Sequence, residues 1–166
     1  MPGANASIGG MVSTRASGTT TVMYGAMTHN VLALEAVLPD GRVMRCGTRA
    51  RKSSAGYDLV RLLTGAEGTL GIISQITLRL RGYPEEIGAA TCAFSTLRGA
   101  VDTVTQLLQL GAPMARMEFL DEVQIRACNK HSQLSLDELP TLFLEFHGTA
   151  ASVAEQADRA QEVAAE

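Results

Sequence analysis

The sequence has few of the residues that build metal sites or disulfide frameworks. Its 166 residues include three cysteines, at positions 46, 92 and 128, and three histidines, at positions 29, 131 and 147. No cysteines stand at CxxC spacing, no histidines at HxxxH spacing, and the odd number of cysteines argues against a disulfide framework. We therefore expect no metal site, and free thiols in a reducing compartment.

The sequence also lacks a basic excess and a long apolar run. Its net charge is −3 and its pI about 5.6, which does not favour a nucleic-acid partner. No apolar stretch approaches the length of a membrane span, and the start lacks a charged region followed by an apolar one. With 46% hydrophobic residues, the composition is typical of a globular protein, and we expect a soluble cytoplasmic one.

Both ends of the sequence suggest a piece of something longer. Almost nothing precedes the glycine-rich stretch at the start, and the end, 151–166, is helical in pattern and stops without a cap. We expect an internal fragment of a larger protein, with the missing remainder as its partner and a homo-oligomer as a further possibility.

The first half of the chain is expected to be rich in loops and strands. Residues 1–30 suggest loop and turn with short extended pieces, and "LALEAVLPDGRVMRC" predicts a hairpin that turns at Pro39-Asp40-Gly41. A short helix is predicted over 57–63, with Ser53 or Ser54 as starters and Tyr57-Asp58 packing and capping it. Alternation over 69–80 predicts a half-buried strand whose apolar face holds Leu70, Ile72, Ile76, Leu78 and Leu80, with Ile73 on the other face.

After a boundary near residues 83–87, strands and helices alternate. Strands are predicted over 91–95, "ARMEFL" and "TLFLEFHG". Helices are predicted over 97–108, from Asp121 to about Lys130, and over 151–165. The order β-α-β-α-β-α favours an α+β sheet with its helices on one face.

Two segments are rich in small residues that leave the backbone bare. "IGGMVSTRASGTTTVMYGAMTHN" holds four glycines and seven serines or threonines, and "GAEGTLGII" holds three glycines ahead of a strand. Glycine lets a ring or a pyrophosphate approach the main chain, but it also serves tight turns and bulges. Neither segment is a GxGxxG fingerprint or a Walker loop, so composition alone leaves cofactor binding and simple turns both open.

The order of these motifs resembles a known family. "IGGMVSTRASG…YG", the "VLPDG" hairpin and "KSSAGYDLVRLLTGAEGTLGII" are similar to the second half of the FAD-binding domain of vanillyl-alcohol-oxidase-type flavoproteins. Within them, the D-lactate dehydrogenase, glycolate oxidase subunit and D-2-hydroxyglutarate dehydrogenase branch is the most similar. "RMEFLD" and "LFLEFHG" resemble the start of that branch's substrate or cap domain.

This resemblance implies an α+β fold in two parts. Residues 1–85 would be the C-terminal half of a flavin-binding subdomain, a mainly antiparallel sheet with short helices, and residues 86–166 the start of a ferredoxin-like cap domain. The implied cofactor is FAD. Its implied contacts, largely through main-chain atoms, are Pro2, Gly3, Ala4, Ser7, Gly9, Gly10, Thr14, Arg15, Ala16, Ser17, Gly18, Tyr24, Gly25, Glu67, Gly68, Thr69, Leu70, Gly71, Ile72 and Ile73.

The implied activity is FAD-dependent oxidation of a D-2-hydroxy acid (lactate, glycolate or 2-hydroxyglutarate) by hydride transfer to the flavin. The resemblance places the catalytic base and one phosphate-binding loop outside these residues, so we expect the chain alone to be inactive. Two alternatives stay open: an alkyl-dihydroxyacetonephosphate synthase-like flavoenzyme, and a non-catalytic nucleotide-binding or association module.

Several polar residues remain ambiguous. His147 shares a strand face with Glu145, and it either has a substrate or metal role or is a solvated strand end. Arg116 and Glu118 also share a strand face, and they either face the substrate or form a surface ion pair. A basic run has two interpretations: it binds a phosphate, an acidic substrate or a partner subunit, or it is a solvated loop. Its members are Arg42, Arg45, Arg49, Arg51 and Lys52.

Overall fold

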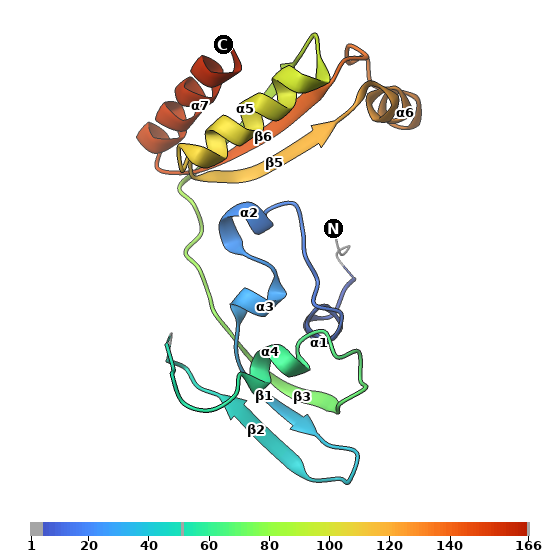
Figure 1. Ribbon diagram of the computed structural model, residues 1–166, viewed down its shortest axis with the longest axis vertical. Coiled ribbons are helices and arrows are strands. Elements are labelled where there is room, and N and C mark those ends of the chain that lie inside the picture. The colour runs from blue at the N-terminus through green and yellow to red at the C-terminus, as the bar shows by residue number, and fades with distance from the viewer. Residues whose placement is uncertain (1–4, 51, 166) are drawn as a thin grey trace. The chain divides into compact units, whose positions relative to one another are not determined.

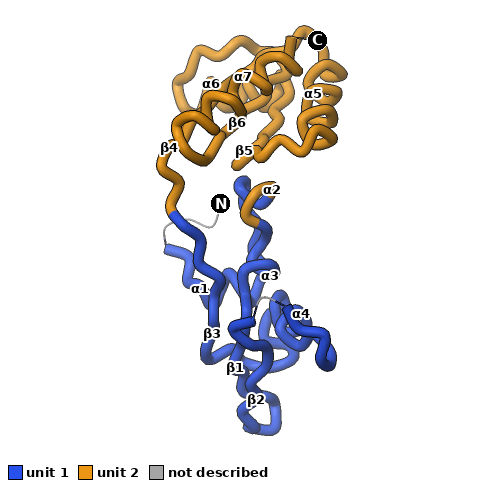
Figure 2. Tube along the Cα trace, turned by 90° about the vertical axis from the view of Figure 1, so that its left-hand side faces the viewer, with its two compact units in different colours: residues 1–21, 25–82 blue, residues 22–24, 83–166 orange. Residues whose placement is uncertain are grey.

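The computed structural model describes residues 5–50 and 52–165, so Pro2, Gly3, Ala4 and Arg51 lie outside the described part. By contacts the chain divides into two compact units (Figure 2). The first comprises Met1–Thr21 and Gly25–Gly82, and the second comprises Val22–Tyr24 and Tyr83–Glu166. Each unit contains its own sheet and its own buried core, and each is described by itself.

The first unit contains the three-stranded antiparallel sheet β2-β1-β3 (Figure 1). Its strands are β1 (Val31–Val37), β2 (Val43–Gly47) and β3 (Ile72–Leu78). The predicted hairpin is present: Leu38 donates its N–H to the carbonyl of Arg42, and Gly41 adopts φ 84° in the turn. Leu34 and Ala36 of β1 are buried in the core.

The predicted face of the third strand is right for Ile76 and Leu78, which pack on the core, and wrong for its other members. Ile73 packs on the core, whereas Ile72 is 65% exposed and Leu80 lies beyond the strand at 88%. The cause is a bulge: Glu35 pairs with Gln75 but the next residue, Ala36, pairs with Ile73, so Ser74 is an extra residue. One inserted residue moves the following side chains to the opposite face.

The segment expected to be loop and extended pieces forms three short helices instead. They are α1 (Ile8–Ser13), α2 (Thr21–Tyr24) and α3 (Met27–Asn30). The first begins because Ser7 Oγ accepts the Gly10 N–H at 3.0 Å, which stabilises one turn without an apolar stripe. Such single turns leave no helical periodicity in the sequence.

The fourth helix, α4 (Leu59–Leu63), begins at an aspartate rather than at a serine. Asp58 accepts the Arg61 N–H at 3.0 Å and also pairs with that side chain. Tyr57 is 94% exposed, so the expected cap is present but the expected packing is not. The buried residues Val60 and Leu63 attach the helix to the core.

The second unit is an antiparallel sheet, β4-β6-β5, with α5 and α7 over one face (Figure 1). Leu142, Leu144 and Phe146 of the central strand are buried in the core that these helices share. The first strand starts earlier than predicted, because Glu86 already pairs with Gly148. The elements are β4 (Glu86–Ala93), α5 (Leu97–Gln109), β5 (Met114–Leu120), α6 (Glu122–Ser132), β6 (Thr141–Gly148) and α7 (Ala150–Ala164).

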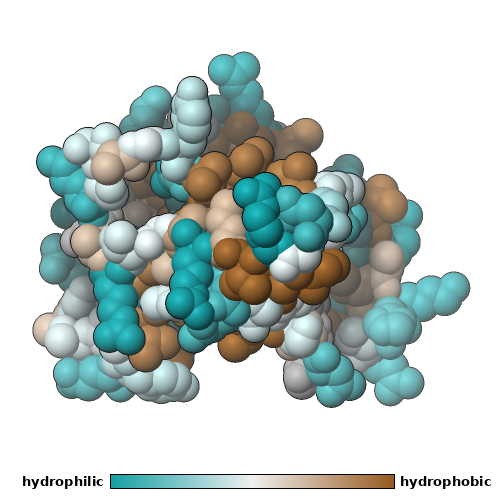
Figure 3. Space-filling model, turned by 90° about the horizontal axis from the view of Figure 1, so that it is seen from below, coloured by the Kyte–Doolittle hydropathy of each residue, from teal (hydrophilic) through white to brown (hydrophobic). Residues whose placement is uncertain are grey.

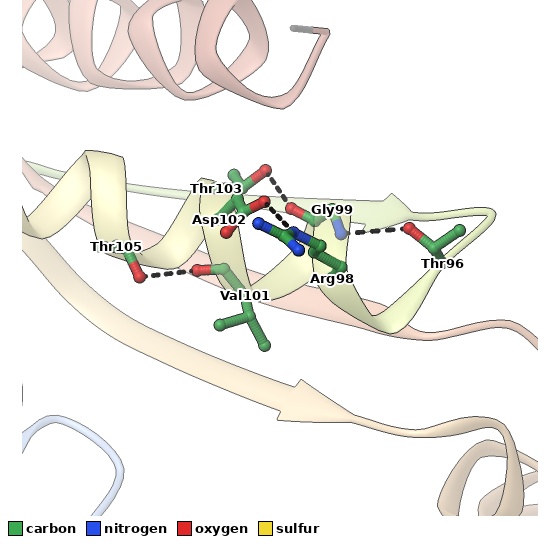
Figure 4. A network of polar contacts seen from close by, with 7 residues as sticks. All are labelled: Thr96, Arg98, Gly99, Val101, Asp102, Thr103 and Thr105. Carbon is green, nitrogen blue, oxygen red and sulfur yellow. Dashed lines mark hydrogen bonds and ion pairs between the residues drawn. The ribbon is translucent and has the colours of Figure 1, made fainter.

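A capping side chain marks the start of each of these helices. Thr96 Oγ1 accepts the Gly99 N–H at 3.1 Å, and one turn later Arg98 pairs with Asp102 on the exposed side of α5 (Figure 4). Asp121 and Thr149 cap α6 and α7 in the same way. None of the described helices has the length and apolarity that crossing a bilayer requires.

Candidate functional site

The two glycine-rich segments lie side by side in the first unit. The backbone N–H of Gly65 donates to the carbonyl of Val12 at 3.0 Å, and that of Glu67 donates to the carbonyl of Ser13 at 3.1 Å. A Cβ added at Gly65 would stand 2.8 Å from the Cβ of Arg15. The turn after α4 is therefore hydrogen-bonded to the last residues of α1.

The same two turns hold strained backbone. Arg15 has φ 54° and Glu67 has φ 49°, the left-handed region that side chains disfavour by about 1–2 kcal/mol. Among the described residues, one other non-glycine residue has a positive φ. It is Gln133 at the end of α6, where a left-handed residue commonly ends a helix. Strained backbone of this kind persists only where the surrounding structure holds it in place, and it is common at binding sites.

The glycines at Gly9 and Gly18 have no role in packing. A Cβ at either position would meet no atom of the described residues within 4 Å, and neither has a positive φ. Gly9 even lies inside α1, where glycine costs about 1 kcal/mol relative to alanine. Nearby, Thr19 Oγ1 is buried without a hydrogen-bond partner among the described residues. Open space at bare backbone and an orphaned hydroxyl fit a ligand such as FAD lying against this segment.

The structure places the other predicted contacts as follows. Thr14 Oγ1 donates to the Gly10 carbonyl, and the N–H of Gly18 donates to Thr21 Oγ1. The predicted contacts from Gly68 to Gly71 form the turn before β3 and lead into the sheet, where Ile72 pairs with Val37. Tyr24 is not gathered with them, since it is part of the second unit and contacts His147 there. The described contacts sit at α1 (Ser7, Gly9, Gly10), after it (Thr14, Arg15, Ala16, Ser17, Gly18), at the end of α2 (Tyr24, Gly25) and around the start of β3 (Glu67, Gly68, Thr69, Leu70, Gly71, Ile72, Ile73).

A second polar cluster, which shares only Tyr24 with the sequence-based list of contacts, lies in the second unit. Tyr24 Oη is 2.5 Å from His147 Nδ1, and His147 Nε2 is 2.9 Å from Glu145 Oε1. The other oxygen of Glu145 lies 3.3 Å from a terminal nitrogen of Arg116. The shared strand face of Glu145 and His147 was visible in the sequence, but their partners come from other elements and carry no spacing signal.

The surroundings of Cys46 and Cys92 favour the neutral thiol over the nucleophilic thiolate. Burial raises the pKa of both thiols, and for Cys46 the nearby Asp58 carboxylate raises the pKa further while a backbone hydrogen bond at Leu34 lowers it. All three cysteines are free. The described residues contain no group of three metal-ligating side chains.

The first unit also has an open polar cavity of about 550 Å³. Its charged lining residues are Lys52, Asp58, Arg61 and Arg79, of which Asp58 and Arg61 pair with one another. None of the predicted flavin contacts lines it. It is thus separate from the two meeting turns.

Comparisons with known proteins identify both halves of the chain. Residues 2–47 match the model of the FAD binding domain, and residues 83–166 match that of the C-terminal domain of FAD linked oxidases. Over 165 residues the chain is 52% identical to a protein named probable mitochondrial D-lactate dehydrogenase from Danio rerio, covering 98% of the chain and 33% of that protein. It is 50% identical to mitochondrial D-lactate dehydrogenase [cytochrome] of Arabidopsis thaliana, covering 98% of the chain and 29% of that protein.

A solved structure shares the fold. An alkyldihydroxyacetonephosphate synthase superposes with a TM-score of 0.76 at 20% identity, covering 95% of the chain and 31% of that protein. The α+β flavoprotein fold is thereby confirmed, and FAD is the cofactor that both family models name. The chain spans about a third of the length of the relatives it matches.

The predicted cytoplasmic localisation is wrong. The relatives from Danio rerio, Arabidopsis thaliana and Saccharomyces cerevisiae are all named as mitochondrial. Net charge and hydropathy indicate how a folded segment interacts with water, whereas import into an organelle is directed by a separate targeting signal. Composition therefore did not carry the information that the prediction needed.

Proposed function

The chain belongs to the FAD-linked oxidases, and from this premise we propose that it forms part of an enzyme that oxidises a D-2-hydroxy acid, with D-lactate as the first candidate. The observation that carries the proposal is the meeting of the strained turns at Arg15 and Glu67 beside open, glycine-lined backbone. Sequence identity of 52% and 50% to two D-lactate dehydrogenases supports the choice of substrate.

In this proposal the two parts of the chain have different tasks. Residues 1–85 are the C-terminal half of the FAD-binding subdomain, and residues 86–166 begin the substrate or cap domain. When bound, FAD supplies the acceptor for the hydride that leaves the substrate's Cα. The chain's own contribution is to hold the cofactor along the predicted contacts, where bare main chain at Gly9 and Gly18 admits it closely.

Glycolate and 2-hydroxyglutarate are the other substrates that the proposal allows. A D-2-hydroxyglutarate dehydrogenase from Danio rerio is 36% identical, lower than the two D-lactate dehydrogenases. The likeness to alkyldihydroxyacetonephosphate synthase, at 20% identity, is a likeness of fold alone and does not favour that chemistry.

The remaining partners are also proposals. The rest of the parent enzyme would cover surface that this chain leaves open, and a homo-oligomer would do the same. Large apolar side chains such as Val43, Leu62 and Ile72 are 59%, 59% and 65% exposed in the first unit. Figure 3 shows apolar side chains gathered between hydrophilic ones on the face that it presents.

The test is flavin reduction in the FAD-loaded protein that carries this chain. Anaerobic addition of D-lactate should bleach the visible flavin band, and L-lactate at the same concentration should not. Glycolate and D-2-hydroxyglutarate, added in parallel, rank the substrates by their rates of bleaching. A yellow protein that none of these acids bleaches would refute the proposed oxidation, and a protein that remains colourless after loading with FAD would favour the non-catalytic module.

A further inference from the structure

The open polar cavity of the first unit is built entirely from elements of that unit. The loop from β2 to α4 supplies one part of its wall, and α3, the start of β1 and the residue after β3 supply other parts (Figure 1). None of the predicted flavin contacts that the structure describes lines it, so FAD does not account for it. Its volume of about 550 Å³ lies in the range of sites for small organic ligands.

The cavity has a positively charged lining although the chain is acidic. Lys52, Arg61 and Arg79 line it against one carboxylate, Asp58, in a chain whose net charge is −3. Asp58 is already engaged, because it accepts the Arg61 N–H and pairs with the Arg61 side chain. No carboxylate among the described residues pairs with Lys52 or Arg79. A cleft lined by charge of one sign concentrates ligands of the opposite sign, so the cavity favours an anion.

The neutral polar side chains of the lining also offer hydrogens to a ligand. His29 Nδ1 accepts the Ala26 N–H at 3.1 Å, so in the neutral ring the hydrogen is on Nε2, which is a donor. Thr48 Oγ1 and Ser53 Oγ each accept a backbone N–H from two residues further along, at 3.2 and 3.3 Å, and each keeps its own hydrogen to donate. The lining therefore matches a group that accepts several hydrogen bonds, as the oxygens of a phosphate do.

A buried hydroxyl of the lining lacks a partner. Thr28 of α3 lines the cavity and is 7% exposed, yet its Oγ1 makes no hydrogen bond with the described residues. A buried polar group left unsatisfied costs about 1–3 kcal/mol, and folded proteins leave few such groups without a partner. A ligand oxygen in the cavity would supply the missing acceptor.

From these observations we propose that the cavity binds a small organic phosphate, at a site separate from the predicted flavin contacts. Lys52 and Arg79 neutralise the phosphate group, and Thr28 donates its hydroxyl to a phosphate oxygen. A phosphate ion alone is too small for a cavity of about 550 Å³, so the organic part of the ligand occupies the rest. Tyr57 also lines the cavity and is 94% exposed, so its ring is available to stack on that organic part.

The first test is equilibrium dialysis of the FAD-loaded protein that carries this chain. The probes are inorganic phosphate, ribose 5-phosphate and AMP, which share the phosphate chemistry and differ in their organic part. We expect AMP to bind most tightly and inorganic phosphate most weakly, because only AMP has a ring that stacks on Tyr57. Inorganic phosphate that binds as tightly as AMP would assign the site to the free ion and overturn the organic ligand.

The second test removes the charges of the cavity. Lys52→Gln and Arg79→Gln should each raise the Kd for AMP about 10-fold or more, because each removes a charge-assisted contact. The matched control is Arg42→Gln, which makes the same change of charge in the same unit, since Arg42 is exposed, pairs with Asp40 at 2.7 Å and does not line the cavity. It should leave the Kd unchanged. Equal weakening in Lys52→Gln and Arg42→Gln would show a general effect of charge and overturn the site.

The third test uses the orphaned hydroxyl. Thr28→Val keeps the shape of the side chain and removes an unsatisfied group, so without AMP the melting temperature should stay the same or rise. The same variant should bind AMP about 10-fold more weakly, because the phosphate loses a donor. A Thr28→Val protein that melts lower and binds AMP like the wild type would show that this hydroxyl serves the protein and not a ligand, against the proposal.

Two further outcomes would overturn the site as a whole. One is an FAD-loaded wild type that binds none of the probes at millimolar concentration, which indicates that the rest of the parent enzyme fills the cavity. The other is AMP binding that loading with FAD abolishes, which places the cavity in the flavin site. If Arg79→Gln does not fold, Lys52→Gln decides the charge test, because Lys52 lies in an exposed loop. These outcomes are independent of the proposed oxidation, which is tested by flavin bleaching with D-lactate.

Discussion

The N–H of Glu67 donates to the carbonyl of Ser13 at 3.1 Å, which joins two turns that are far apart in the chain. Both turns were singled out in the sequence because small residues expose their backbone there. A cofactor site and simple close packing respond differently to substitution beside such a joint. Substitution of a glycine by alanine can alter packing, backbone conformation or the approach of a ligand. Several glycines of the chain lie where only one or two of these effects apply, so their variants separate the two explanations.

Gly65→Ala should destabilise the first unit more than its conformational cost alone. Gly65 has φ 89° and a Cβ there would stand 2.8 Å from Arg15 Cβ. Gly41 has φ 84° but open space around it, so Gly41→Ala reports the conformational cost by itself, about 1–2 kcal/mol. We expect Gly65→Ala to lose roughly 1–3 kcal/mol beyond Gly41→Ala in urea unfolding, because the turn after α1 must move. Equal losses would show that the two turns do not pack tightly.

Much of the fold follows from patterns that the sequence displays locally. The hairpin at Asp40-Gly41 and the strand–helix alternation after residue 86 were predictable, because each depends on residues adjacent in the chain. The bulge at Ser74 was not, since it is set by pairing with Glu35 on another strand. For the candidate site, the bare segments were visible in sequence, but the link from Tyr24 to His147 required the tertiary fold.

Gly88→Ala should destabilise the second unit by overpacking. A Cβ at Gly88 of β4 would stand 2.6 Å from Val153 Cγ1 of α7, where helix and sheet are in contact. We expect a loss of roughly 1–3 kcal/mol in the free energy of unfolding. Val153→Ala, added to Gly88→Ala, should restore part of it because it removes the clashing methyl. Gly82→Ala, which meets no atom within 4 Å, is the control. A double variant less stable than Gly88→Ala would contradict the assignment.

Glu35 should stabilise the first unit in a pH-dependent way. Hydrogen bonds first from Arg45 and then from Ser74 lower the pKa of this carboxyl below its ordinary value. Because the folded pKa is lowered, the contribution is present above the ordinary pKa and is lost as pH falls through the folded one. Titration followed by NMR should show the Glu35 pKa rising in Arg45→Ala and, by a smaller step, in Ser74→Ala. A larger rise in Ser74→Ala would reverse the order of the two causes.

Gly9→Ala tests whether the open space at α1 belongs to FAD. The new methyl meets no atom of the described residues, and alanine is the better helix former, so stability without FAD should rise by about 0.5–1 kcal/mol. Gly99→Ala in α5 is the matched control: its methyl makes only ordinary contacts with Thr96 and Phe94 at 3.5 and 3.6 Å, and the same rise is expected. If FAD lies against Gly9, then Gly9→Ala should weaken FAD binding about 10-fold or more, measured by flavin fluorescence, because a methyl holds the ligand away from the main chain. Gly99→Ala should leave the Kd for FAD unchanged. A Gly9→Ala protein that is more stable and binds FAD as tightly as the wild type would remove Gly9 from the site, and the cofactor would then have to meet the chain elsewhere.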